Sequence, residues 1–300
     1  MDISVVIPVY NRKALMRHTL ECIRRSPVWP VNVIAVDNGS NDGTAEMLAG
    51  YAASCPELTV LHEPERNAAA ARNLGLSKVR TEWVCFFDSD DEFTGLPESW
   101  DREADLIAIP IMQKFNGRTS VRAYKTSADP AVHITNSMLN TPSMIFRTSW
   151  LKEIGGWNRE CSIWDDWELG ARALMASPRL QWIEDRPYHI INIHDDSLTG
   201  PSFKSRYRKQ LNTLRIVSDE AARCSQPMRD RCLKALMLRT FILAGKLLEE
   251  GDSKAAGECR SFISEVFPGK PDGYRMGRIL EWYTSIGGRG AWKIAIRTLK

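Results

Sequence analysis

Short apolar runs alternate with longer segments of helical character through the first ninety residues, and this alternation constrains the fold more than any other feature. Four runs are rich in β-branched or aromatic residues and end at turn formers, at residues 3–9, 31–36, 58–61 and 83–87. Helices are predicted in the gaps, over residues 13–25, 43–53 and 68–79. Strands that alternate with helices in this way form a parallel sheet covered by helices. The sequence therefore predicts an α/β fold.

The pattern changes twice further along the chain. Residues 101–149 are less regular, with strands predicted at 106–111 and 119–124. A helix is predicted at 165–175, and two more strands at 180–183 and 188–193. From residue 203 onward, apolar positions recur at spacings of three and four, as they do in 233–248 and 279–286, which is typical of helices. The Gly200-Pro201 pair is the predicted boundary between residues 1–200 and a helical extension over 201–300.

The formal net charge of +3 conceals an uneven distribution of charge. Residues 1–200 contain 20 Lys and Arg and 27 Asp and Glu, a net charge of −7, whereas residues 201–300 contain 20 and 10, a net charge of +10. One interpretation is that the basic part faces a phosphate-bearing partner or an anionic membrane surface. The other interpretation is a solvated helical face.

Two absences in the sequence bear on where the chain is expected to work. No apolar stretch reaches the roughly 18 to 20 residues that cross a bilayer, and no basic segment precedes the first apolar run. The seven cysteines form an odd set without a C-x-x-C pair, which predicts reduced thiols rather than disulfides or a zinc site. We expect a cytoplasmic protein, with the inner face of the membrane as the second location.

Polar residues follow three of the predicted strands at the point where each strand ends. Ligands of open α/β sheets bind beyond the carboxyl ends of the strands, where such residues meet. The sequence therefore predicts a binding cleft lined by Tyr10-Asn11, Asp37-Asn38-Gly39-Ser40 and Asp88-Ser89-Asp90-Asp91.

The turn after the first strand narrows the class of ligand. Residues 8–12 contain no glycine, which excludes the G-x-G-x-x-G and G-x-x-x-x-G-K-[ST] phosphate loops. Asp88 and Asp90, on either side of Ser89, can share Mg²⁺ or Mn²⁺ with a diphosphate, because carboxylates alone would repel phosphate. The alternative is that residues 88–92 form only a solvated turn.

Taken in order, these segments resemble the inverting glycosyltransferases of family 2, which have the GT-A fold. The motifs that carry the resemblance span most of residues 3–200 and are VVIPVYNR, VDNGSNDGT, RNAAAARNLGL, FFDSDDE, NTPSMIFR, GGWN, WDDWELGAR and HDDSLTG. Residues 201–300 have no such match. The resemblance implies a mainly parallel, Rossmann-like sheet flanked by helices. It also implies a nucleotide-sugar-binding half over residues 1–100 and an acceptor-binding half over 101–200.

The resemblance further implies that a nucleotide-sugar donor lies across strands one, two and four. The implied donor-binding residues are Pro8, Tyr10, Asn11, Asp37, Asn38, Arg66, Arg72, Asp88 and Ser89. Asn38 stands where the family more often has Asp, and its amide can accept or donate a hydrogen bond. A UDP-sugar is the expected donor, with dTDP- and GDP-sugars left open. Asn67 stands where the family commonly has Gly, which predicts a left-handed backbone there.

A divalent cation, Mn²⁺ or Mg²⁺, is the cofactor that the resemblance implies. It assigns Asp88 to the ribose hydroxyls and the metal shell, and Asp90 to direct coordination. His194 opens the segment HDDSLT, which resembles the family loop that approaches the metal or the diphosphate. The alternative for His194 is a histidine on a surface loop. The cation would act as a Lewis acid on the leaving nucleoside diphosphate.

The second acidic motif resembles the family segment that holds the general base, and Asp166 is the matching residue. Asp165 and Glu168 have the spacing of a capping box and are expected to serve the helix start in one interpretation. Trp157, Trp164 and Trp167 could stack on an acceptor sugar, but core packing accounts for all three equally well. We expect only Trp164, which directly precedes the acidic pair, and Asp165 to bind the acceptor. One base without an enzyme nucleophile implies a single displacement with inversion at the anomeric carbon.

The function that these residues predict is transfer of a sugar to a hydroxyl of a glycan or glycolipid acceptor, in cell-surface polysaccharide synthesis. One alternative is a non-catalytic subunit that binds a nucleotide sugar. Nucleotidyl transfer is the other, but it requires a glycine-rich triphosphate loop after the first strand. We expect no nucleic-acid partner. Residues 290–300 interleave cations with apolar residues, which predicts either contact with an anionic bilayer, with Trp292 at the headgroups, or packing onto the protein.

Overall fold

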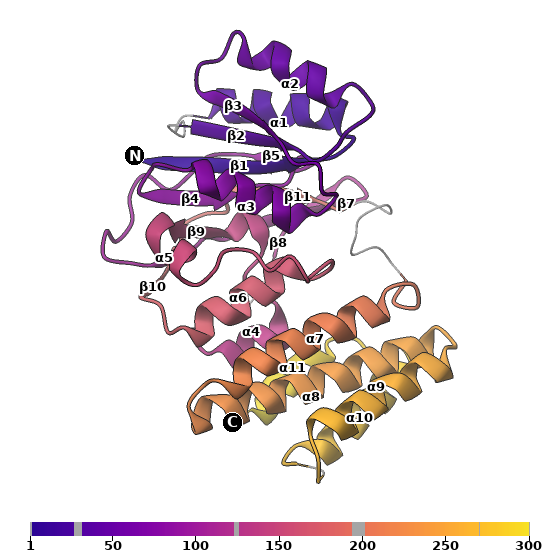
Figure 1. The fold of residues 1–300 in the computed structure, drawn as a ribbon. Helices are drawn as coiled ribbons and strands as arrows, with labels where there is room; N and C mark the ends of the chain where they lie inside the picture. The colour runs from indigo at the N-terminus through magenta and orange to yellow at the C-terminus, as the bar shows by residue number, and fades with distance from the viewer. Residues whose placement is uncertain (1, 27–31, 123–125, 194–201, 270, 300) are drawn as a thin grey trace. The chain divides into compact units, whose positions relative to one another are not determined.

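The computed structural model describes residues 2–26, 32–122, 126–193, 202–269 and 271–299 (Figure 1). Its contacts separate two compact units, each of which is described by itself. The sheet unit comprises residues 1–123, 139–159 and 178–197, and the helical unit comprises residues 124–138, 160–177 and 198–300. The functional boundary expected at residue 200 remains a prediction.

A seven-stranded sheet forms the centre of the sheet unit, with the strand order β10-β6-β9-β4-β1-β2-β3. Strand β1 is parallel to β2 and β4, β2 is parallel to β3, and β6 is parallel to β10. Only β9 runs antiparallel to its neighbours β4 and β6 among the described strands of this sheet. The predicted, mainly parallel α/β fold is thus confirmed. The strands are β1 Ile3–Val9, β2 Asn32–Asp37, β3 Leu58–His62, β4 Trp83–Phe86, β6 Leu106–Ala108, β9 Met144–Arg147 and β10 Leu180–Trp182.

Helices α1 Lys13–Arg25, α2 Thr44–Ala52 and α3 Ala68–Lys78 occupy the gaps where helices were predicted, and the short helix α5 spans Thr148–Glu153. Helix α3 packs on β1, β2 and β3 (Figure 1). A Cβ atom at Gly75 of α3 would lie 2.4 Å from Val6 Cγ1, so a larger residue would push the helix off the sheet. The close approach of α3 to β1 therefore depends on this glycine.

A second, four-stranded sheet has the order β5-β11-β7-β8. The predicted strand at 106–111 ends at residue 108, and the chain resumes as β7. The strand predicted at 119–124 is observed at residues 118–121. Strand β5 has only two residues, too few to show a period of two in the sequence. The strands are β5 Glu92–Phe93, β7 Met112–Phe115, β8 Arg118–Val121 and β11 His189–Asn192.

The helical unit is built around one long helix, α8, which packs against α4, α7, α9, α10 and α11. Two glycines, one on each helix, allow α8 and α10 to pack closely. A Cβ at Gly245 of α8 would lie 2.5 Å from the carbonyl oxygen of Glu281, and a Cβ at Gly277 of α10 would lie 2.1 Å from Phe241 Cδ2. The predicted C-terminal helices are confirmed, and α6 has the predicted bounds. The helices are α4 Pro130–Asn136, α6 Asp165–Met175, α7 Tyr207–Ala222, α8 Gln226–Glu249, α9 Ser253–Val266, α10 Tyr274–Ser285 and α11 Ala291–Thr298.

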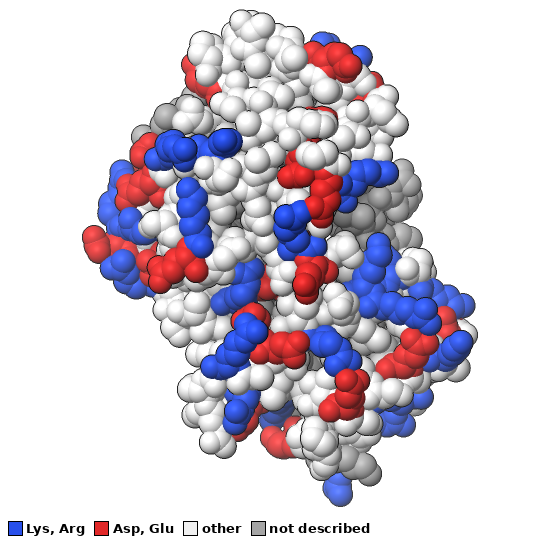
Figure 2. Space-filling model, in the orientation of Figure 1, with Lys and Arg blue, Asp and Glu red and all other residues white. Residues whose placement is uncertain are grey.

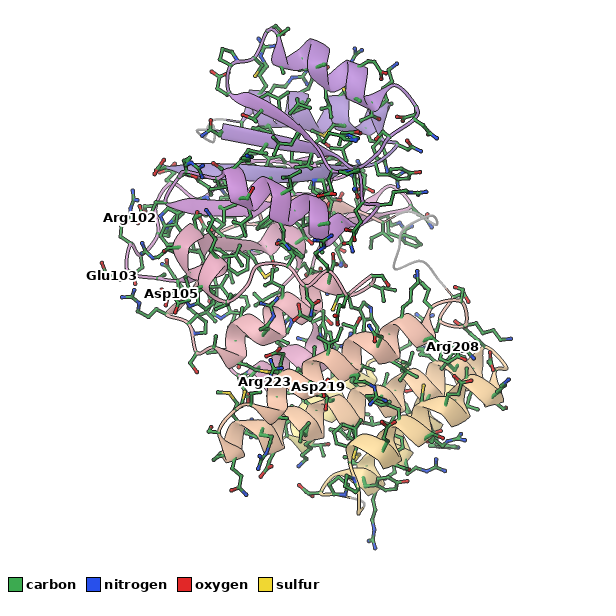
Figure 3. All side chains as sticks on the ribbon, in the orientation of Figure 1. Arg102, Glu103, Asp105, Arg208, Asp219 and Arg223 are labelled. Carbon is green, nitrogen blue, oxygen red and sulfur yellow. The ribbon has the colours of Figure 1, made fainter. Side chains whose placement is uncertain are left out.

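Charged side chains form ion pairs on both units. In the sheet unit, Arg179, the residue before β10, lies 2.9 Å from Glu103 and 3.5 Å from Asp105. Glu103 and Asp105 are labelled in Figure 3. In the helical unit, Lys and Arg side chains gather at the N-terminal end of α7 (Figure 2), where Arg208 pairs with Glu258 at 3.2 Å. Each of these pairs joins opposite charges within one unit, so the net charges of residues 1–200 and 201–300 remain uneven.

All seven cysteines are free thiols, as predicted. Burial raises the pKa of Cys85 to about 12, so this thiol is protonated and unreactive at neutral pH. None of the helices in the described ranges is both long enough and apolar enough to span a bilayer.

Candidate active site

The turns that follow β1 and β2 are joined by hydrogen bonds at the carboxyl edge of the seven-stranded sheet. The Asn38 N–H donates to the Val9 carbonyl at 2.8 Å, and the Asn11 N–H donates to Ser40 Oγ at 3.0 Å. Asn11 Oδ1 in turn accepts from the Asn41 N–H at 2.8 Å. Asn11 adopts a left-handed backbone with φ of +50°, which Asn tolerates better than most residues. The two turns therefore form one structure that fixes the backbone on either side of Tyr10.

The carboxylate of Asp37, the last residue of β2, has two hydrogen-bonding partners. Its Oδ2 lies 3.1 Å from His62 Nδ1, and its Oδ1 accepts from the Ser40 N–H at 3.3 Å. In the register of the sheet Asp37 is opposite Val9, and Pro8 is opposite Val36. The predicted donor residues Pro8 and Asp37 thus lie on adjacent strands, next to the bonded turns.

The amide of Asn38 has a fixed orientation. Its Nδ2 donates to the backbone carbonyls of Glu63, at 3.1 Å, and of Glu65. Because carbonyl oxygens can only accept, the amide nitrogen must face them, and Oδ1 is the atom that can serve a ligand. The choice between donor and acceptor that the sequence left open is resolved in favour of an acceptor.

Arg66 and Tyr10, both predicted to contact a donor, lie against each other. The guanidinium carbon of Arg66 is 4.1 Å from the centroid of the Tyr10 ring, a cation–π contact. The prediction for the next residue was wrong: Asn67 has an extended backbone, with φ of −149°. Asn67 is the N-cap of α3, and its Oδ1 accepts from the Ala70 N–H at 3.1 Å. Asparagine suits this position because of its capping oxygen.

Arg72 and Asp88 meet as an ion pair beneath the end of β4. Arg72 is only 5% exposed, its Nη2 lies 2.8 Å from Asp88 Oδ1, and its guanidinium carbon lies 4.3 Å from the centroid of the Trp157 ring. A buried guanidinium with these neighbours orients the Asp88 carboxylate. Trp157 is buried here, so core packing accounts for it.

The acidic turn after β4 is anchored by two other elements. Thr19 Oγ1 of α1 lies within hydrogen-bonding distance of the Ser89 and Asp91 carbonyls, at 3.2 and 3.1 Å. The Asn192 N–H of β11 donates to Asp91 Oδ1, and Asn192 Nδ2 donates to the Asp90 carbonyl, both at 2.9 Å. Ser89 and Asp91 are buried. The alternative that this segment is only a solvated turn is therefore wrong.

The carboxyl groups of the turn differ in environment. Asp91 is 3% exposed, and burial raises the pKa of its carboxyl well above the usual range, with the charges of Asp88 and Asp90 adding to the effect. Asp90 is partly exposed, and its Oδ2 lies 3.9 Å from Arg12 Nε. Asp91 is thus an internal support of the turn, whereas Asp88 and Asp90 present carboxylate oxygens at its surface.

These oxygens fit a hard divalent cation, because Mg²⁺ and Mn²⁺ prefer carboxylate ligands. Within the described ranges, no cluster of three or more His, Cys, Asp or Glu side chains is arranged to hold a metal ion by itself. Asp88 and Asp90 are the residues of this turn whose carboxylates could ligate such a cation. His194, the third predicted ligand, lies outside the described residues.

In the helical unit, the predicted base lies at the first turn of α6. Trp164 has a left-handed backbone with φ of +57°, and Asp165 and Asp166 are the first two residues of the helix. Asp165 Oδ1 accepts from the Asp166 N–H at 3.0 Å, and Asp166 Oδ1 accepts from the Trp167 N–H at 2.7 Å. Carboxylates are favoured at this end of a helix because unpaired N–H groups point there.

The capping-box interpretation of this helix start was wrong. Asp165 lies inside the helix and is not its N-cap. Glu168 is buried and pairs with Arg172 at 2.7 Å instead of reaching back to the helix start. Burial raises the pKa of Glu168, while the hydrogen bond from Arg172 lowers it. Glu168 is therefore a structural residue, because its carboxylate is engaged within the helix.

Arg239 of α8 supports the aromatic residues beside the base. Its guanidinium carbon lies 4.4 Å from the centroid of the Trp164 ring and 4.6 Å from that of Trp167. Its Nη1 donates to the Ile134 carbonyl at 2.9 Å. Trp167 is buried in the core, while Trp164 is half-buried.

The structure brings the predicted residues together in two groups. The donor and metal residues of the described chain all belong to the sheet unit, and Trp164, Asp165 and Asp166 belong to the helical unit. Sequence reasoning missed the residues that hold these groups in place. They are distant in sequence from the residues that they contact and belong to none of the quoted motifs, so their role becomes visible only in the three-dimensional structure. These residues are Thr19, Asn192 and Arg239; Arg12 lies in the VVIPVYNR motif, but the sequence analysis assigned it no role.

The family model described as "Glycosyl transferase family 2" matches residues 4–154, about half of the chain. The pre-mycofactocin glycosyltransferase of Mycobacterium tuberculosis is 30% identical over 198 residues, which are 60% of this chain and 41% of the relative. The amylovoran biosynthesis glycosyltransferase AmsB of Erwinia amylovora is 36% identical over 121 residues, 39% of this chain and 38% of the relative. The chain thus spans less than two thirds of the length of these relatives.

Two solved structures have a similar fold. TarS of S. aureus, residues 1–349 in complex with UDP-GlcNAc, has a TM-score of 0.72 and 18% identity and covers 99% of this chain and 91% of TarS. The mannosyltransferase PcManGT of Pyrobaculum calidifontis, in complex with GDP-Man and Mn²⁺, has a TM-score of 0.57 and 18% identity and covers 98% of this chain and 86% of PcManGT. These similarities confirm the predicted GT-A fold with its C-terminal helices.

Our first prediction concerns Asn192, which anchors the acidic turn. Asn192→Ala should weaken UDP binding in the presence of Mn²⁺ by about 10- to 100-fold, the usual effect of removing a residue that orients a metal ligand. Calorimetry measures this change. Gln113→Ala, on the neighbouring strand β7, is the matched control and should bind UDP as the unmodified chain does. Equal affinities in both variants would show that Asn192 does not position the turn.

Proposed function

Because the chain belongs to glycosyltransferase family 2, we propose that it transfers a sugar from a nucleotide-sugar donor to a hydroxyl group of a glycan or glycolipid acceptor, with inversion at the anomeric carbon. The observation that carries this proposal is the anchored turn after β4. There, Asp88 and Asp90 remain at the surface while Asp91 supports them from inside. AmsB, by its name, acts in amylovoran biosynthesis, which supports a role in polysaccharide synthesis.

The donor base is proposed to lie between the first two turns, where the Arg66–Tyr10 pair offers a stacking surface. Asn38 Oδ1 would accept from an N–H on the edge of the base. Uracil, thymine and guanine carry such an N–H, whereas the corresponding ring nitrogen of cytosine is an acceptor. The nucleotides bound by TarS and PcManGT are a uridine and a guanosine diphosphate sugar, which agrees with this requirement. A UDP-sugar is our proposed donor.

The second prediction tests the orientation of Asn38. UDP should bind more tightly than CDP by about 10- to 100-fold, because cytosine would set an acceptor against Oδ1 and leave a buried group without its hydrogen bond. Calorimetry with both nucleotides gives the ratio. In Asn38→Ala the ratio should fall close to one, whatever the loss in overall affinity. Equal binding of UDP and CDP to the unmodified chain would overturn the assignment.

Asp88 and Asp90 would hold the divalent cation, which when bound would neutralise the negative charge that develops on the leaving nucleoside diphosphate. The protein's own contribution is to orient these carboxylates. Arg72 fixes Asp88 through the ion pair and is itself held over Trp157. The backbone of Asp90 is fixed by Asn192, so its carboxylate projects from a rigid turn. Preorganised charges of this kind need no rearrangement when the reaction occurs.

The third prediction is that UDP binding depends on a divalent cation and that Asp90→Ala abolishes the dependence, because the diphosphate otherwise faces the carboxylates unscreened. The measurement is UDP affinity with Mn²⁺ and with EDTA. Glu98→Ala, which removes an exposed carboxylate elsewhere in the sheet unit, is the control and should keep the full dependence. If the unmodified chain binds UDP equally well in Mn²⁺ and in EDTA, a cation has no role in donor binding.

Asp166 is our proposed general base, which takes the proton from the acceptor hydroxyl as that oxygen attacks the anomeric carbon. The hydrogen bond from the Trp167 N–H orients the Asp166 carboxylate at the start of the helix. The half-buried Trp164 ring would pack against the apolar face of an acceptor sugar. A single base without an enzyme nucleophile gives one displacement, and hence inversion.

The fourth prediction separates Asp166 from its neighbour. Asp166→Asn should lower kcat by about 100- to 10,000-fold while UDP affinity is unchanged, since a base acts on the acceptor and not on the donor. Asp165→Asn, one residue away in the same turn, should lower kcat much less. Comparable losses in both variants would assign the pair to the helix start. Tight donor binding without turnover by the unmodified chain would favour the non-catalytic alternative.

A further inference from the structure

Helix α10 exposes a row of large apolar side chains. Ile279, Trp282 and Ile286 are 53%, 62% and 64% exposed, and their spacing of three and four residues places them on one face of the helix. The opposite face is buried at Gly277, Leu280 and Thr284, where α10 packs against α8. The three side chains are therefore not needed to hold α10 in the helical unit. We call this row the α10 ridge.

Basic side chains accompany the α10 ridge. Arg275 precedes Ile279 by one helical turn and so shares its face. Arg289 lies in the link between α10 and α11, and Lys293 and Arg297 lie on α11. All four are exposed, and none forms an ion pair with a carboxylate of the described chain.

The acidic residues near the α10 ridge form ion pairs with basic residues other than these four. Asp272 pairs with Lys234 at 2.7 Å, and Glu281 is buried between Arg260 and Arg278, at 2.7 Å from each. Helix α7 differs, because its Arg208 and Arg223, labelled in Figure 3, pair with Glu258 and Glu220. The segment from α10 to α11 therefore presents positive charge that no carboxylate of the described chain offsets.

The sequence analysis left two alternatives for residues 290–300, contact with a bilayer or packing onto the protein. The structure shows that α11 packs onto the helical unit. Ala291, Ala295 and Leu299 are buried in the core of the helical unit, so its apolar face packs against the protein. Trp292 is half-buried, with Lys293 Nζ 5.4 Å from its ring centroid. Of the large apolar residues exposed in this region, Ile294 of α11 is 37% exposed, whereas Ile279, Trp282 and Ile286 are all more than half exposed.

We propose that the α10 ridge and its four cations form a binding surface for an anionic lipid bilayer. A row of isoleucines with a tryptophan, flanked by unpaired cations, is the composition of helices that lie in the membrane interface. Three side chains on one helix are far fewer than the 20 to 30 residues that each partner contributes to a stable protein interface. Each Lys or Arg near an anionic surface strengthens binding by about fivefold, so the four cations select anionic lipid. This inference concerns where the protein binds and does not depend on the proposed transferase activity.

The test is co-sedimentation of the full chain with vesicles of phosphatidylcholine, with or without phosphatidylglycerol. Binding should require phosphatidylglycerol and weaken as salt is added. Changing Ile279, Trp282 and Ile286 together to Ser should lower binding more than about tenfold. Arg275→Ala with Arg289→Ala should lower it about 25-fold, at fivefold for each cation.

The matched control is Phe115→Ser with Arg118→Ala, which removes an equally exposed apolar residue and an exposed cation from β7 and β8 of the sheet unit. This variant should bind vesicles as the unmodified chain does. Circular dichroism and UDP affinity verify that each variant is folded.

Three results would overturn the proposal. The first is failure of the unmodified chain to bind phosphatidylglycerol vesicles at low salt. The second is an equal loss of binding in the control and ridge variants. The third is a dimer in light scattering that the triple serine variant converts to monomer, because the ridge would then be covered by a second copy of the chain.

Discussion

A hydrogen bond to one buried carboxyl group supports the geometry of the candidate active site. Asp91 lies inside the sheet unit and accepts from the Asn192 N–H, which joins the turn after β4 to the strand β11, about a hundred residues further along the chain. Thr19 adds a bond from α1 to the same turn. Because the turn is held from two sides, the carboxylates before Asp91 project from a rigid backbone. In the proposed function, this rigid placement would set the positions of the two carboxylates before a diphosphate binds.

The same edge of the sheet brings the turns after β1 and β2 beside the acidic turn after β4. Strand β1 pairs with both β2 and β4, so the residues that follow these three strands meet at the carboxyl edge. Loop-to-loop hydrogen bonds around Asn11 then join the first two turns. The donor residues form a single group because strand order determines which loops become neighbours.

This grouping could be predicted from the sequence, since apolar runs mark the strands and polar residues mark where each one ends. The orientation of Asn38 could not, because it depends on carbonyls of a loop some 25 residues away. Asn67 was predicted to have a left-handed backbone by analogy with glycine, but its side chain caps α3. Asp165 and Glu168 had the spacing of a capping box, but Arg172 attracts the buried Glu168. In each case a tertiary or helical partner overrode a local pattern.

The helical unit shows the same limit of sequence patterns. Spacings of three and four residues predicted its helices, but they do not say which apolar residues are covered. Helices α10 and α11 both carry apolar and basic residues, yet α11 buries its apolar face and α10 leaves a row of large side chains exposed. Packing against α8 determines which face of α10 is buried. Gly277 lies on that face, and its lack of a side chain lets α10 approach Phe241 of α8.

The proposed reaction is a single displacement, in which a base activates the acceptor oxygen that attacks the anomeric carbon. It can be tested by proton NMR of the sugar released when the protein hydrolyses an α-linked UDP-sugar, recorded before the anomers equilibrate. We expect the β-anomer to form first. Initial release of the α-anomer would rule out a single displacement, because retention requires an enzyme nucleophile or another mechanism that the proposed site does not provide.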